Sequence, residues 1–241
     1  MDLITLDFET FYDKDFSLTK MTTEEYIRDS RFEIVGVGVK VNNGPTEWAS
    51  GTHAELAEYL AEFDWASSMV LAHNTMFDGA ILSWLFGIKP KVWAVEVGGS
   101  LKALAKRYEI GEKGTEILNA LGKRREGFTE DELDRYGDYC INDVELTYKL
   151  FGIMVRGFPK QELKVIDCTL RMFIHPLLVL DCDLLEDHLY DIKLRKDKLL
   201  RDAGVEDRKE LMSNDKFAEL LRSKGVTPPT KISMTTGKEA Y

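Results

Sequence analysis

Two acidic residues near the start of the chain have the types and spacing needed for metal-dependent chemistry. Asp7 and Glu9 lie at the end of a short apolar run within residues 1–10. Such a run is typical of a buried strand, on which side chains two residues apart point the same way. We therefore expect the two carboxylates to lie side by side, with Leu6 and Phe8 facing away. The usual counter-charge for paired carboxylates is a hard divalent cation such as Mg²⁺ or Mn²⁺.

An Asp-x-Glu pair by itself is more often a strand end exposed to water, so the metal hypothesis depends on further acids. Asp78 follows the apolar run 69–72, where a strand is expected to lead into a helix. Ligands gather at that position in α/β sheets. Asp143 lies in a long helical pattern, four residues after Tyr139 and hence on the same face. Taken alone, Asp143 would be interpreted as an exposed acid on a helix.

These four acids come from three separate elements, and they would need compensating charge if they met. At ~6 Å and an effective dielectric constant of about 20, each ionised pair repels by roughly 3 kcal/mol. Four negative charges balance the charges of two Mg²⁺ ions, and two such ions ~3.5–4 Å apart form a site that cleaves phosphate esters. Tyr139 is suited to orient the attacking water, because a tyrosine with its ordinary pKa near 10 is a poor base.

The elements that must position these residues alternate between short strands and helices, as in α/β proteins. A capping box, Thr129 with Glu132, predicts the start of the long helix. The break at Gly157-Phe158-Pro159 predicts a boundary between domains over 1–157 and 158–241, with a polar C-terminal tail that has no core of its own. We expect strands over 34–41, 46–48, 69–72 and 92–95, a strand-like run over 177–180, and helices directly after Asp78 and over 53–63, 100–108, 114–123, 129–154, 160–173, 183–202 and 215–222.

The composition is ordinary for a globular protein, with 44% hydrophobic and 31% charged residues among 241. No apolar stretch approaches the ~20 residues of a membrane helix, and the first strand follows Met1 directly, so we expect neither a membrane partner nor a signal peptide. The three cysteines, Cys140, Cys168 and Cys182, are unpatterned. They indicate a reducing compartment and no metal-ligand role.

The charge distribution is uneven. A net charge of −10 argues against broad nonspecific binding of nucleic acids. Residues 102–125 are the exception, with seven Lys or Arg against three Glu. This basic region is either the solvated face of two helices or a strip that contacts a phosphate backbone.

Three motifs occur in a fixed order: Asp7-Phe8-Glu9-Thr10, the run from Asn74 to Asp78, and the run from Tyr139 to Asp143. Together they resemble the three exonuclease motifs of the DEDD 3′–5′ exonucleases. The Tyr-x-x-x-Asp form of the third motif resembles the tyrosine subgroup. The resemblance is greatest to the proofreading domain of family A, DNA polymerase I-like, DNA polymerases of the bacteriophage type, and it covers about residues 1–155.

The resemblance implies a ribonuclease H-like fold, a mixed sheet flanked by helices, followed by a mainly helical C-terminal segment. It implies release of nucleotides from the 3′ end of single-stranded DNA with two divalent ions, Mg²⁺ or Mn²⁺, in the cytoplasm of a bacterial or phage-infected cell. By motif position, the metal ligands would be Asp7, Glu9, Asp78 and Asp143. Tyr139 would align the water, Thr10 and Asn74 would touch the substrate strand, and Phe77 would pack in the core.

Beyond residue 160 the sequence resembles the entry into a polymerase region, including the start of the thumb over 177–181 and 227–237. The palm and fingers motifs are not found in this sequence, so polymerisation is not expected from it. The expected partner is a polymerase domain in the same or a longer chain.

One departure from the family pattern lies between Trp93 and Gly99, where about one helix is missing. The departure leaves room for a catalytically silent platform beside a polymerase. An exonuclease acting on RNA, as in the ribonuclease D relatives, is a third possibility.

Overall fold

The computed structural model describes residues 1–95, 99–114, 120–205 and 208–241. The chain divides into two compact units, Met1–Leu177 and Leu178–Tyr241. Two predictions, the helix over 114–123 and the shortened segment between Trp93 and Gly99, depend on residues 115–119 and 96–98, which lie outside the described ranges.

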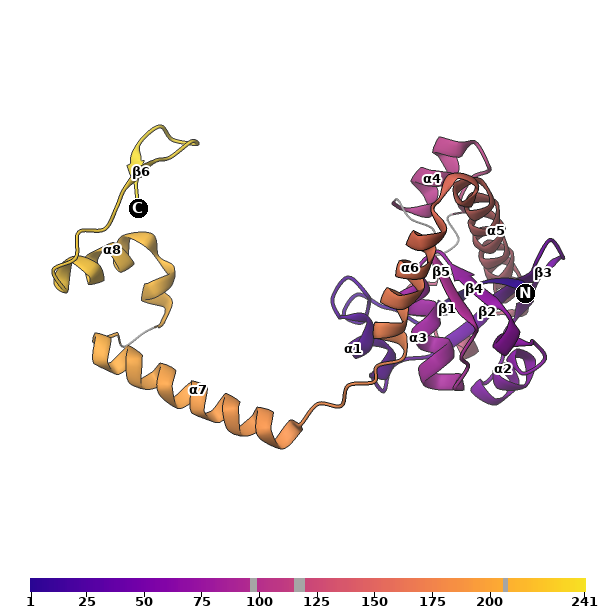
Figure 1. The fold of residues 1–241 in the computed structure, drawn as a ribbon, viewed down its shortest axis with the longest axis horizontal. Helices are drawn as coiled ribbons and strands as arrows, with labels where there is room; N and C mark the ends of the chain where they lie inside the picture. The colour runs from indigo at the N-terminus through magenta and orange to yellow at the C-terminus, as the bar shows by residue number, and fades with distance from the viewer. Residues whose placement is uncertain (96–98, 115–119, 206–207) are drawn as a thin grey trace. The chain divides into compact units, whose positions relative to one another are not determined.

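The first unit is built on a five-stranded mixed sheet in the order β3-β2-β1-β4-β5 (Figure 1). The central strand β1 pairs antiparallel with β2 and parallel with β4, and β5 is parallel to β4. The mixed sheet predicted from the sequence is therefore confirmed. The strands are β1 (Leu3–Thr10), β2 (Ile34–Val41), β3 (Thr46–Ala49), β4 (Met69–Ala72) and β5 (Val92–Val95).

Helices cover both faces of this sheet (Figure 1). The helices α3 (Thr75–Phe86) and α6 (Lys160–Ile174) pack on one face, and α5 (Glu130–Met154) packs on the other, across β1, β2 and β3. The helix α4 (Leu101–Tyr108) packs against α5. The shorter elements of this unit are α1 (Thr23–Arg28), α2 (His53–Leu60) and the 3₁₀ helices η1 (Trp65–Ser67), η3 (Arg125–Gly127) and η4 (Val155–Gly157).

The two faces of β1 bury different kinds of side chain. Ile4, Leu6 and Phe8 belong to the largest apolar cluster, which also contains residues of α2, α3 and α6. Alternation along the strand turns Asp7 and Glu9 to the opposite face, towards α5. The predicted opposition of Leu6 and Phe8 to the two acids is therefore confirmed.

Small residues allow α5 to approach the sheet closely. A Cβ atom added to Gly38 of β2 would lie 2.9 Å from Cys140 Sγ of α5. A Cβ atom added to Gly137 of α5 would lie 2.6 Å from Cδ1 of Trp48. Both separations are shorter than a normal van der Waals contact, so a larger residue at either position would force its neighbour to shift. This close packing brings the predicted catalytic face of α5 to the end of β1.

Helix starts follow the expected capping chemistry, with one shift. Thr129 and Glu132 form the predicted capping box at the start of α5. The helix α3 begins at Thr75, after Asn74, so Asp78 lies in its first turn and not ahead of it. The carboxylate is consequently presented by a helix that packs against β1 and β4.

The first unit extends twenty residues beyond the boundary expected at residue 157, to Leu177. The reason is that α6 packs on the sheet unit. The Trp84 indole donates to the Ile174 carbonyl at 2.9 Å, and the Trp93 amide donates to Asp167 Oδ1 at 2.7 Å. Leu170 also enters the main apolar cluster.

The second unit contains little buried surface among its described residues, where Val205 and Ala218 are the buried hydrophobic side chains. The predicted strand-like run over 177–180 is wrong: these residues form no strand, and Leu178 is 95% exposed. No helix in the described part of the chain is long and apolar enough to cross a membrane. The elements are α7 (Cys182–Ala203), η5 (Arg208–Met212), α8 (Asn214–Ser223) and a two-stranded sheet of β6 (Lys231–Ile232) and β7 (Glu239–Ala240).

Candidate metal centre

A cleft of about 290 Å³ lies at the carboxyl end of β1 and β4. All of the acids predicted from the sequence line it, and they come from β1, α3 and α5. The lining residues that bear on the chemistry are Asp7, Glu9, Thr10, His73, Asn74, Asp78, Lys113, Tyr139 and Asp143.

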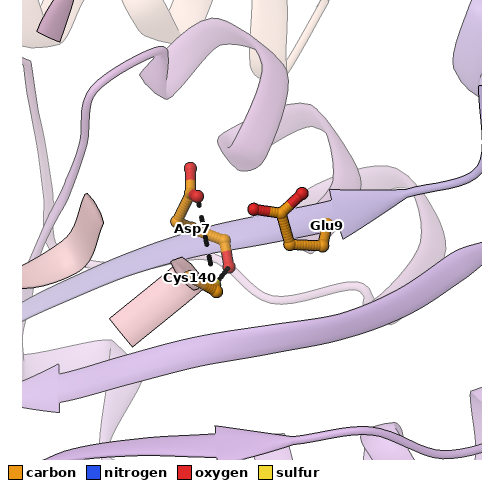
Figure 2. Close-up of side chains that lie close together, drawn as sticks. All are labelled: Asp7, Glu9 and Cys140. Carbon is orange, nitrogen blue, oxygen red and sulfur yellow. Dashed lines mark hydrogen bonds between the residues drawn. The ribbon is translucent and has the colours of Figure 1, made fainter. Parts of the chain in front are cut away.

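The β1 pair forms one wall of the cleft. Figure 2 shows the carboxylates of Asp7 and Glu9 projecting from the same side of the strand. Glu9 is 7% exposed, and its Oε2 accepts a hydrogen bond of 2.6 Å from the hydroxyl of Tyr136. Burial raises the pKa of Glu9 to about 7, although the Tyr136 hydrogen bond opposes this rise. The two acids therefore lie together in a poorly solvated place.

Asp78 meets the same strand from α3. It is 1% exposed, and its Oδ1 accepts a hydrogen bond of 3.0 Å from the backbone amide of Phe8, the residue between the paired acids. Burial raises the pKa of Asp78 to about 7, and the Phe8 amide partly offsets this effect. That hydrogen bond fixes the first turn of α3 against the end of β1.

Asp143 completes the cluster from α5 and is 3% exposed. Its Oδ2 forms an ion pair with the ammonium group of Lys113, and its Oδ1 is buried without a hydrogen-bond partner. The Tyr139 ring lies one helical turn away, and burial together with the Asp143 charge raises the pKa of Tyr139. A buried carboxylate oxygen without a partner is costly, so it indicates a site for a cation or a donor.

The four carboxylates act on one another electrostatically. The pKa of Asp7 is raised well above its ordinary value by burial and then by Asp78, Glu9 and Asp143, whereas Lys113 lowers it. Among the described residues of the cleft there are four acids, and one ammonium group, that of Lys113, contacts them through Asp143. The ionised cluster therefore carries an excess of negative charge. An excess of this kind inside a protein is resolved by protonation or by cations.

The donor set fits a hard divalent cation. The four acids offer carboxylate oxygens, which suit Mg²⁺ and Mn²⁺, and Asp143, which lines the cleft, has one buried oxygen without a hydrogen-bond partner. Cys140 lies close to Asp7 and Glu9, but its thiol donates to the Asp7 carbonyl at 3.3 Å (Figure 2). Burial raises the pKa of this thiol well above its ordinary value, so Cys140 is a packing residue and not a thiolate ligand.

The structure brings together every catalytic residue predicted from the sequence. The predicted substrate contacts, Thr10 and Asn74, also line the cleft, and Phe77 packs in the main core as expected. Sequence reasoning missed two contacts, Tyr136 on Glu9 and Lys113 on Asp143. Helical spacing places Tyr136 on the Tyr139 face, whereas no local pattern marks Lys113.

The basic region over 102–125 divides into two parts. Lys123 and Arg124 are paired with Glu132 and Glu33 respectively, and Lys113 is paired with Asp143. Lys102, Lys106 and Arg107 on α4 are exposed, with no ion pair to any described acid. The amide of Leu101, at the start of the same helix, donates to His73 Nε2 at 3.1 Å, which ties α4 to the cleft.

Comparison with known proteins identifies the fold. No protein-family model matches the sequence, and no curated protein matches it. Among solved structures, ribonuclease D of Trypanosoma brucei matches with a TM-score of 0.55 and 15% identity, over 74% of this chain and 67% of that one. NrnC of Brucella melitensis matches with a TM-score of 0.47 and 13% identity, over 71% of this chain and 81% of that one. The likeness to the ribonuclease D structure shows the fold of this chain, a ribonuclease H-like mixed sheet flanked by helices.

Proposed function

We propose that this chain is a metal-dependent 3′–5′ exonuclease that releases nucleotides from the 3′ end of single-stranded DNA. The observation that carries the proposal is the convergence of Asp7, Glu9, Asp78 and Asp143 on one cleft. Their mutual repulsion is unfavourable in a protein without a cationic ligand. Phosphodiester hydrolysis is the chemistry for which such a ligand-bound cluster is suited.

The four carboxylates would hold two divalent ions, Mg²⁺ or Mn²⁺. When bound, such ions lower the pKa of a coordinated water and stabilise the leaving oxygen of a phosphodiester. Tyr136 and the Phe8 amide orient two of the proposed metal ligands, because their hydrogen bonds hold Glu9 and Asp78 in place. The Tyr139 hydroxyl is a hydrogen-bonding group for the attacking water, since its raised pKa makes it a poor base.

The substrate strand would be held by polar residues of the same cleft. Thr10 and Asn74 are polar groups of the lining that can contact the terminal nucleotide. The exposed basic side chains of α4 offer contacts to the phosphates further along the strand. A local basic strip of this kind reconciles nucleic-acid binding with the net charge of −10.

We further propose that the chain is the proofreading part of a family A polymerase of the bacteriophage type. The order of the three motifs and their tyrosine form support this assignment. Residues 178–241, the second unit, would belong to the entry of the polymerase region, and a polymerase domain would be the partner. The free cysteines Cys168 and Cys182 suit a cytoplasmic location in a bacterial or phage-infected cell.

An RNA 3′ end is the second candidate substrate, and the likeness in fold to a ribonuclease D favours testing it. The deciding experiment compares digestion of a 3′-labelled single-stranded DNA with that of an RNA of the same sequence, in Mg²⁺, in Mn²⁺ and in EDTA. We expect metal-dependent release of single nucleotides from the DNA. Faster trimming of the RNA would transfer the proposal to ribonuclease activity, and no cleavage of either strand by a protein that binds Mn²⁺ would favour a silent platform.

A further inference from the structure

Lys113 occupies an unusual place for a cation in a predicted metal centre. Its ammonium group is paired with Asp143 Oδ2, and it lies 5.3 Å from the centre of the Tyr139 ring. The same charge lowers the pKa of both Asp7 and Glu9 of β1, so together with Asp143 of α5 it acts on acids from two elements. One lysine therefore already balances part of the negative charge that a divalent ion would balance.

The backbone around Lys113 is held in position by the third motif. The side-chain amide of Asn142 donates to the Glu112 carbonyl at 3.0 Å. Glu112 directly precedes Lys113, and Asn142 directly precedes Asp143, so this bond joins the two backbones beside the ion pair. Gly111 has φ of 148° and lies against Leu146 of α5, where a Cβ atom would be 2.8 Å from Leu146 Cδ2. The ion pair is thus set by contacts to α5 and not by chance proximity of a long side chain.

The ammonium group of Lys113 also has space into which it can move away from Asp143. Its side chain is 27% exposed, whereas that of Asp143 is 5% exposed. Lys113 and Tyr139 line both the carboxylate cleft and a second hollow of about 500 Å³. The second hollow is open to solvent, and its lining contains two acids, Glu112 and Asp138, against one other cation, Arg135. A shift of the ammonium group towards that hollow would leave both carboxylate oxygens of Asp143 able to bind another cation.

We propose that Lys113 is the resident counter-cation of the carboxylate cluster and that a divalent metal ion displaces it from Asp143. This inference rests on the proposed function, because it assumes that the cluster binds metal. The unpartnered Asp143 Oδ1 marks where a cation could first bind, and Oδ2 is the oxygen that must be released. The two cations repel each other, so each one lowers the affinity of the cluster for the other.

The test is Mn²⁺ binding to the full chain, measured by calorimetry without nucleic acid. Lys113→Met removes the competing charge, and we expect Mn²⁺ to bind about five- to tenfold more tightly. Lys113→Arg keeps the charge and should stay within about twofold of the original affinity. Lys164→Met is the matched control, because it removes an exposed lysine on α6, on the opposite face of the sheet.

Tighter binding separates displacement from a merely structural role, because loss of a structural contact would loosen the ligands and weaken Mn²⁺ binding. Unchanged or weaker binding in a folded Lys113→Met protein would overturn the inference. If the unaltered chain binds no Mn²⁺ at all, the proposed function fails as well. Binding by the unaltered chain without any tightening in Lys113→Met rejects only the role of Lys113.

A second measurement needs no substitution and covers the case in which Lys113→Met does not fold. Acetylation of lysines in the native chain, followed by mass spectrometry, reports how freely each amine reacts. We expect Lys113 to be acetylated several-fold faster after Mg²⁺ is added, because its ion pair has been broken, while Lys164 stays unchanged. Equal acetylation of Lys113 with and without Mg²⁺, at a concentration that saturates the site, would contradict displacement.

Discussion

The two faces of the central sheet are built on opposite principles. The face covered by α2, α3 and α6 carries one continuous apolar cluster, to which β1 contributes Ile4, Leu6 and Phe8. The face covered by α5 carries three smaller apolar clusters and buries the polar groups Thr5, Glu9, Lys40, Asp143 and Thr147. One face gains free energy by removing apolar surface from water, and the other retains charges that cost free energy.

This difference separates the side chains that stabilise the fold from those of the proposed site. Alternation along β1 lets one eight-residue strand serve both faces at once. Apolar burial on the α3 side compensates for the carboxylate repulsion in the cleft, to which α3 itself contributes Asp78. Away from the cleft on the α5 side, the charge of buried Lys40 is neutralised by the half-buried Glu145 at 2.7 Å. The cleft itself keeps an excess of acid.

Asp143→Ala should give the largest effect and breaks the charged face alone. We expect cleavage to fall by at least about a thousandfold, because one of the metal-holding groups is lost. The stability of the metal-free protein should change little, since the loss of the Lys113 ion pair is offset by the removal of one of four repelling charges. Asp134→Ala, on an exposed position of α5, is the control and should cleave normally. A normal rate of 3′-end trimming by Asp143→Ala would remove this residue from the mechanism.

The pH dependence of stability sharpens the comparison, because it arises in the cleft at the end of β1, where Glu9 of β1 meets Asp78 of α3. Burial raises the folded-state pKa of Glu9 and Asp78 to about 7 in the metal-free protein. The folded state then binds more protons than the unfolded state between about pH 4 and pH 7, so stability falls as pH rises through this window. A pKa that is one pH unit higher in the folded state than in the unfolded state corresponds to about 1.4 kcal/mol of unfolding free energy.

Urea unfolding in EDTA from pH 5 to pH 8 measures this fall. Excess Mg²⁺ should reduce it, because the ion stabilises the ionised carboxylates of the folded state. Stability that rises across the same range in EDTA would contradict the crowding of these acids.

Leu6→Ala tests the apolar face. The side chain is fully buried in the main cluster, so its truncation should cost about 2–5 kcal/mol of unfolding free energy. Mn²⁺ affinity of the folded protein should change little, because Leu6 points away from the acids. Urea unfolding and Mn²⁺ calorimetry on one preparation separate the two quantities. A large loss of Mn²⁺ affinity without loss of stability would show that the faces are not independent.

Gly38→Ala tests the close contact between β2 and α5, which determines how near α5 lies to the sheet. The new methyl group would meet Cys140 Sγ at 2.9 Å and Val144 Cγ2 at 3.1 Å, which pushes α5 outward. We expect a cost of about 1–3 kcal/mol and slower cleavage, because Asp143 moves with the helix. Adding Cys140→Ala removes the clashing sulfur and should recover part of both losses. No recovery in the double variant would assign the loss to another cause.

Replacing Lys102, Lys106 and Arg107 by Gln should have the smallest effect on the fold and should change only the binding of the substrate. We expect weaker binding of single-stranded DNA and unchanged Mn²⁺ affinity. The slope of log affinity against log salt should decrease by about 2 for three phosphate contacts. Fluorescence anisotropy in Ca²⁺ at several salt concentrations measures this slope. An unchanged slope would make this strip a solvated helix face.

The residues by themselves determined much of the design. Alternation along β1 set Asp7 and Glu9 against Leu6 and Phe8, helical spacing joined Tyr139 to Asp143, and Thr129 with Glu132 marked the start of α5. These are local consequences of strand and helix geometry, which depend on neighbours within a few residues.

Tertiary structure alone decided the contacts between distant segments. Asn142 holds the backbone beside Lys113, thirty residues away, and Gly38 determines how near α5 comes. The helix α6 joined the sheet unit through Trp84 and Trp93, and residues 177–180 formed no strand because they found no pairing partner among the described residues. Charge pairing and close packing depend on which surfaces meet in space, and spacing along the chain carries no record of that.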